Sequence, residues 1–181
     1  MDRPIAMQMI RNALMAVGTQ EEGNNEGDEV EFYQSQCKPP VGAHGPWCAA
    51  FIRAMMKMAA TQLNTTYDST FPRSGYTPDW ANYAKANGLW VPVSAIKDGT
   101  AVPRKGDLAL FYFSQLGRIG HIGVVIDVHP TYMWTIEGNT SPEPDGDGVV
   151  ERDGDGVYKK NRQWSELGKF CLLYTSDAAD D

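Results

Sequence analysis

The hydrophobic pattern of the chain changes once, near residue 89, from a helical period to short strand-like runs. Three segments in the first half place apolar residues every three or four positions, as amphipathic helices do: 3–17, 48–60 and 78–87. Later runs rich in β-branched and aromatic residues predict strands: 108–113, 122–128, 132–137, 148–152 and 156–160. This separation predicts an α+β fold, with N-terminal helices packed on a C-terminal antiparallel sheet. It disfavours the alternating βαβ units of a dinucleotide-binding fold.

Length and charge limit the organisation and the partners. The chain has 181 residues, 42% of them hydrophobic, which suits one domain. The net charge of -7 argues against a nucleic-acid partner, which requires clustered Lys and Arg. No apolar run approaches the roughly 20 residues that span a bilayer, and no signal-peptide pattern is recognisable. We therefore expect a monomer that binds neither nucleic acid nor membrane and is made in the bacterial cytoplasm.

The last eleven residues differ in character from the rest of the chain. One permitted reverse translation of 171–181 resembles a transposase adaptor used in sequencing libraries, as expected for assembled metagenome reads. We therefore expect a catalytic domain over 1–170, truncated at its C-terminus, and a mobile non-native tail over 171–181. The three cysteines, Cys37, Cys48 and Cys171, are too few for a disulfide scaffold, which favours synthesis in a reducing compartment.

One cysteine and one histidine stand where nucleophilic chemistry needs them. Cys48 opens the strongest predicted helix, where backbone N–H groups and the helix dipole stabilise a thiolate. His121 leads a predicted strand and can take the thiol proton as general base. An imidazole base also needs an oxygen partner that fixes its orientation. Glu137 and Asn139 follow the next strand, and geometry alone does not choose between them.

Four short segments carry a family resemblance: PWCAAF at 46–51, GDLALF at 106–111, GHIGVV at 120–125 and EGNT at 137–140. Together and in this order they resemble the CHAP family, the cysteine, histidine-dependent amidohydrolases/peptidases. The resemblance covers about residues 5–165 and implies a papain-like fold. It implies that Cys48 is the nucleophile, His121 the base, Glu137 the orienting acid and Asn139 a further polar partner, with no cofactor.

The resemblance also implies a substrate. Members of the family typically cut peptidoglycan, as muramoyl-alanine amidases or as stem-peptide or cross-bridge endopeptidases, often in phage lysins that act on the cell wall after release. Many members have Gln before the cysteine, where this chain has Trp47, so we assign the oxyanion site to the Cys48 backbone N–H. Some members bind calcium through acidic residues before the cysteine. Residues 38–47 contain none, so no metal is expected.

Several alternatives remain open at this point. A secreted antibacterial toxin amidase would use the same chemistry, and a catalytically inactive relative would bind peptidoglycan without cutting it. His44 is a rival base, whereas His129 is expected in solvent. Cys37, His44 and Cys48 match no common zinc spacing. The repeated Asp-Gly pairs at 145–148 and 153–156 suit either calcium or simple turns.

Overall fold

The computed structural model describes residues 4–66, 70–142, 154–164 and the backbone of 170–173. Its helices are α1 (Pro4–Ala16), α2 (Asp28–Ser35), α3 (Cys48–Gln62), α4 (Thr77–Ala86), α5 (Val93–Lys97) and the 3-10 turn η2 (Ser114–Leu116). Its strands are β1 (Trp90–Pro92), β2 (Leu108–Phe113), β3 (Arg118–Val128), β4 (Tyr132–Thr140), β5 (Gly156–Gln163) and β6 (Phe170–Leu173). Within the described residues, no helix is long and apolar enough to cross a membrane.

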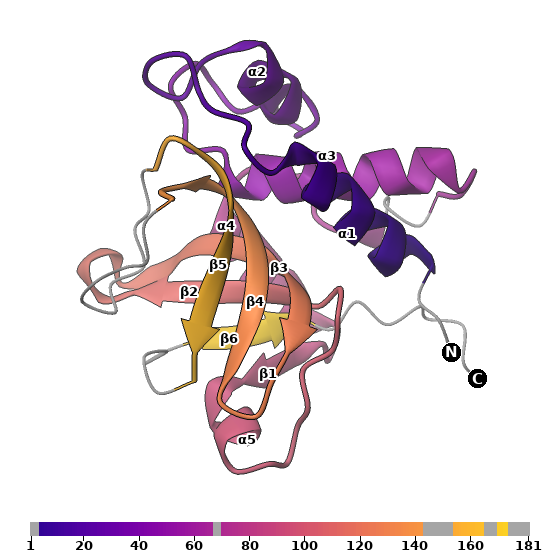
Figure 1. Cartoon of the computed structure of the whole chain (residues 1–181), viewed down its shortest axis with the longest axis vertical. Coiled ribbons are helices and arrows are strands. Elements are labelled where there is room, and N and C mark those ends of the chain that lie inside the picture. Colours follow the sequence, from indigo (N-terminus) through magenta and orange to yellow (C-terminus); the bar gives the residue numbers. More distant parts are fainter. Residues whose placement is uncertain (1–3, 67–69, 143–153, 165–169, 174–181) are drawn as a thin grey trace.

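All the strands belong to one antiparallel sheet with the order β1-β6-β2-β3-β4-β5. Figure 1 shows α1, α2 and α3 gathered at one end of the strongly twisted sheet, with α5 beside β1 at the opposite end. The structure therefore has the predicted α+β architecture, with N-terminal helices packed on an antiparallel sheet.

The sheet buries apolar side chains on both faces. Alternate residues of β2 and β3, such as Leu108, Leu110 and Ile122, join α1, α3 and α4 in the main core. The residues between them, with Met133 and Trp164, form a smaller second cluster. Successive residues of a strand point to opposite faces, so both clusters arise from the same strands.

The helical predictions are confirmed for α1, α3 and α4 to within a few residues. The helix α2 was not predicted from the sequence. This helix has three carboxylates in its first turn, which interact favourably with the helix dipole, and it buries Val30 and Tyr33. Tyr33 packs edge-on against Phe51 of α3, with ring centroids 5.4 Å apart. A helix with so few buried residues has too short an apolar pattern to be found from sequence.

Two strands extend further than predicted, and this changes the position of the site residues. β3 begins at Arg118, so His121 lies inside the strand and not before it. β4 continues to Thr140, so Glu137 and Asn139 also lie inside a strand. β1, α5 and η2 were not predicted. The predicted strand 148–152 and the Asp-Gly pair at 145–148 lie outside the described residues.

The first three residues of the tail that we expected to be mobile, 171–173, belong to strand β6 of the sheet. β6 pairs with β2 on one side and with β1 on the other, with Leu172 opposite Ala109 and Val91. The expectation of mobility is therefore wrong for 171–173, since an open sheet edge pairs with any strand that fits it. The pairing does not test the adaptor origin of the segment, and 174–181 lie outside the described residues.

Candidate active site

Cys48 is the first residue of α3, and its position is set by the turn that leads into the helix. The backbone N–H of Trp47 donates to Oδ1 of Asn139 at 2.9 Å. The Asn139 amide nitrogen donates to Asn25 Oδ1 and to the Gly154 carbonyl, both at 3.0 Å. Asn139 adopts φ 56°, a left-handed conformation that Asn tolerates better than most residues. It ties β4 to the start of α3, and none of these hydrogen bonds involves His121.

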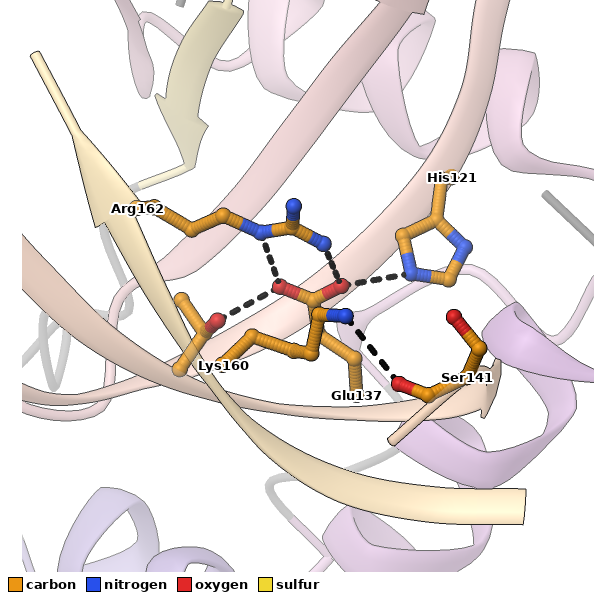
Figure 2. A network of polar contacts seen from close by, with 6 residues as sticks. His121, Glu137, Ser141, Lys160 and Arg162 are labelled. Atoms are coloured by element: carbon orange, nitrogen blue, oxygen red, sulfur yellow. Dashed lines mark hydrogen bonds and ion pairs between the residues drawn. The ribbon is translucent and has the colours of Figure 1, made fainter. Parts of the chain in front are cut away.

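His121 and Glu137 form a buried pair across β3 and β4. The ring nitrogen Nε2 of His121 lies 2.8 Å from Oε2 of Glu137, and neither side chain is exposed to solvent. An ionised carboxylate only accepts hydrogen bonds, so Nε2 carries the proton and donates it to Glu137. The structure thus brings together two of the residues predicted from sequence, and it places Glu137, not Asn139, on the imidazole (Figure 2).

A glycine makes room for this contact. A Cβ atom at Gly123, two residues after His121 on β3, would lie 2.5 Å from Cγ of Glu137. Real Cβ atoms essentially never approach another atom so closely, so a side chain at this position would displace Glu137. Gly123, the second glycine of the GHIGVV segment, therefore has a packing role in the site.

Arg162 of β5 holds the opposite side of the carboxylate. Its Nε donates to Glu137 Oε1 at 2.9 Å and its Nη2 to Oε2 at 2.6 Å, the forked geometry typical of Arg with a carboxylate. Thr135 Oγ1 also donates to Oε1, at 2.5 Å. Beside this network, Lys160 Nζ donates to the Ser141 carbonyl at 3.0 Å (Figure 2). The Glu137 carboxylate thus has partners on both oxygens.

Sequence reasoning missed Arg162, and the strand register explains its position. Arg162 pairs with Met133 on β4, and His121 pairs with Phe111 on β2. Met133 and Phe111 both belong to the second apolar cluster, and directly paired residues share a face of the sheet. Arg162 and His121 therefore project from the same face, toward the Glu137 that lies between them.

The surroundings shift the pKa of both members of the pair. Burial lowers the pKa of His121, but hydrogen bonds and charge interactions with Cys48 and Glu137 outweigh it and raise this pKa to about 9. Burial raises the pKa of Glu137, but the Arg162 charge and the hydrogen bond from His121 outweigh it and hold this pKa well below its usual range. The arrangement favours a protonated imidazole beside an ionised carboxylate.

The second ring nitrogen of His121 is the one left for Cys48. Nδ1 is buried and has no hydrogen bond of good geometry among the described residues. Cys48 is near enough to raise the His121 pKa, and Nδ1 is the ring nitrogen that Glu137 does not occupy. Catalytic hydrogen bonds often tighten only when substrate binds.

A cleft of about 290 Å³ opens beside Cys48. Its walls come from the proline-rich loop before α3, from 74–77 and from the start of β3, and they include Pro39, Val41, Tyr76 and Arg118. Cys48 is itself only 2% exposed, so a reagent reaches its sulfur through this cleft.

The other residues weighed in the sequence lie elsewhere. His44 is exposed, with Nδ1 3.0 Å from the Asn24 carbonyl and 3.3 Å from Glu26. His129 stacks on Tyr132 and contacts Asp127, away from the cleft residues. Cys37 is a buried free thiol whose pKa burial raises to about 11. Within the described part of the chain, no three His, Cys, Asp or Glu residues are grouped as metal ligands.

Comparison with known families identifies the region that contains most of this site. The family model for the CHAP domain matches residues 40–139 of the 181, from the proline-rich loop to Asn139. Searches of curated proteins and of solved structures gave no significant match. The matched region includes Cys48, His121 and Glu137 and ends before Arg162. The chain therefore belongs to the CHAP domain family, a family of hydrolases that act as amidases and peptidases on peptidoglycan.

Proposed function

We propose that this protein hydrolyses an amide bond of bacterial peptidoglycan, with Cys48 as nucleophile, His121 as general base and acid, and Glu137 as the residue that orients His121. The observation that carries the proposal is the buried 2.8 Å contact between His121 Nε2 and Glu137 Oε2, together with the influence of the nearby Cys48 on the His121 pKa. The contact leaves Nδ1 as the nitrogen that exchanges a proton with the thiol.

The reaction proceeds in two halves. In the first, Nδ1 takes the Cys48 proton, the thiolate attacks the amide carbonyl, and Nδ1 returns the proton to the departing amine. This leaves a thioester on Cys48. In the second half, Nδ1 takes a proton from water, the resulting hydroxide attacks the thioester, and the proton returns to the sulfur as the acid leaves.

Two features of the chain support the chemistry around the reacting carbonyl. The backbone N–H of Cys48 lies in the first turn of α3, where an α-helix has no preceding carbonyl to accept it. It is positioned to donate to the negative oxygen of the tetrahedral intermediate. Glu137 keeps its negative charge throughout and stabilises the imidazolium that forms in each half.

Digestion of purified cell walls tests the proposal. The wild-type protein is expected to release muropeptides whose masses, measured by mass spectrometry, identify the cleaved amide bond. Cys48→Ala should abolish release while retaining the circular dichroism and melting temperature of the wild type, because a small buried side chain is replaced by one slightly smaller. Cys37→Ser is the matched control and should retain most activity. Loss of activity in Cys37→Ser with retention in Cys48→Ala would refute the proposed nucleophile.

Chelation separates thiolate chemistry from metal-assisted hydrolysis. Wall digestion is expected to continue in EDTA and to stop after iodoacetamide, because the proposed nucleophile is a thiolate and not a metal-bound water. Complete loss in EDTA that calcium or zinc restores would contradict this mechanism.

A further inference from the structure

A second, larger cleft adjoins the one beside Cys48. It has a volume of about 550 Å³ and lies between α4, β1, α5 and the β2–β3 turn. Its walls include Lys85, Trp90 and Tyr112. Arg118, the first residue of β3, lines both this cleft and the one that contains Cys48. Arg118 is therefore the residue that the two clefts share.

The charge of this groove is opposite to that of the whole chain. The net charge is -7, yet the charged residues among the described linings of both clefts are Lys85 and Arg118, two cations. No described carboxylate forms an ion pair with either of them. Cations grouped in a concave surface concentrate anions there. An acidic protein thus presents a positive groove next to its proposed nucleophile.

Both cations are held against aromatic rings. The Arg118 guanidinium carbon lies 4.9 Å from the centroid of Tyr76, and Lys85 Nζ lies 4.5 Å from that of Trp90. One Arg118 nitrogen, Nη1, donates to the Ile119 carbonyl at 3.0 Å, which further fixes the group. The ring contact restrains Arg118 while its other N–H groups remain able to donate to a carboxylate.

We propose that Arg118 is a specificity residue that binds a carboxylate of the substrate, and that the second cleft holds the acidic peptide attached to the scissile amide, with Lys85 as its further cation. The identity of the peptide rests on the proposed function, because stem peptides of peptidoglycan carry free carboxylates. The preference for an anion beside Cys48 does not depend on the proposed function, because this preference follows from the charges of the groove.

Alkylation of Cys48 tests the anion preference without any cell-wall substrate. Iodoacetate is an anion and iodoacetamide is neutral, and both modify the same sulfur. Mass spectrometry of the peptide that contains Cys48 gives the rate constant for each reagent, and we divide the iodoacetate value by the iodoacetamide value. This alkylation ratio is expected to fall roughly 2- to 5-fold in Arg118→Gln, the range of a partly exposed charge interaction. Arg118→Lys keeps the charge and should retain most of the ratio.

The matched control is Arg11→Gln, which removes the same charge from the exposed face of α1, away from both clefts. Its alkylation ratio should equal that of the wild type. An unchanged ratio in Arg118→Gln, or an equal fall in Arg11→Gln, would overturn the role of Arg118. Both rate constants are measured on the same protein sample. Partial unfolding of a variant would raise both of them, and this joint rise distinguishes unfolding from a loss of the anion preference.

Peptidoglycan fragments test the peptide itself. Wild-type protein should cleave fragments with free peptide carboxylates more efficiently than fragments whose carboxylates are amidated. Arg118→Gln should raise KM for the fragments with free carboxylates, with little change in kcat, and should lose the preference for them. Lys85→Gln should reduce this preference. A preference that persists in both variants would overturn the assignment of the second cleft. If the wild type cleaves neither fragment, the proposed function fails, while the alkylation ratio still decides the role of Arg118.

Discussion

Arg162 and Glu137 form a forked ion pair behind His121, with N–O distances of 2.9 and 2.6 Å. The Arg162 side chain is 4% exposed and the Glu137 side chain is fully buried. A buried carboxylate is stable as an anion when charged partners and donors bind both of its oxygens, and Arg162 supplies two of these hydrogen bonds. The orientation of the proposed base therefore depends on a residue of β5, outside the region that the family model matches.

Removing Arg162 alone is expected to destabilise the protein strongly. Arg162→Met removes the forked partner of the buried Glu137 charge and leaves it with His121 and Thr135, and breaking such a buried ion pair costs about 3–5 kcal/mol of unfolding free energy. The double variant Arg162→Met/Glu137→Gln removes both charges and should be more stable than Arg162→Met. Urea unfolding of the wild type, both single variants and the double variant gives the coupling energy. Additive losses would show that the two residues do not interact in solution.

The pH dependence of activity follows from the His121 pKa. The imidazolium must protonate the leaving amine, and a pKa raised to about 9 keeps the ring protonated up to that pH. We therefore expect kcat/KM to fall as the pH rises through about 9. Glu137→Gln removes one of the interactions that raise this pKa, so the alkaline fall should move to lower pH and activity at neutral pH should decrease. An alkaline limb at the same pH in Glu137→Gln would refute the orienting role.

Local patterns in the sequence predicted the elements that place Cys48 and His121, because both residues lie in long, strongly periodic segments. The pairing of His121 with Glu137 was implied by the family resemblance, whereas strand geometry alone did not choose between Glu137 and Asn139. The pairing depends on a register shift in β4 between Glu137 and Thr140, within which Asn139 takes a left-handed conformation. Arg162 could not be found from the sequence, because its contact with Glu137 depends on the register of β5 against β4. Register is set by three-dimensional packing, and a sequence specifies it only indirectly.

The contacts of Asn139 predict a different effect from those of Glu137. Asn139→Ala removes the acceptor for the Trp47 N–H and the donor to Asn25 and Gly154, all buried. Leaving such groups unpaired costs about 1–3 kcal/mol each. The variant should therefore melt at a lower temperature and lose activity through the displaced start of α3, while its alkaline pH limb stays where the wild type has it. A shifted limb with wild-type stability would transfer the orienting role to Asn139.

Gly123→Ala tests whether the site depends on the exact position of the Glu137 side chain. The new methyl group would lie 2.5 Å from Glu137 Cγ, and this carbon is fixed because its carboxylate is bound by Arg162, Thr135 and His121. The side chain must shift, and we expect a loss of kcat of at least about 10-fold, since displacements near 1 Å at a reacting group have effects up to about 100-fold. The matched control is Gly42→Ala, in an exposed loop where a Cβ meets nothing within 4 Å. Steady-state kinetics on cell-wall fragments measure both variants, and thermal melting separates a displaced carboxylate from general unfolding. Equal activity in the two variants would show that the His121 and Glu137 contact tolerates displacement.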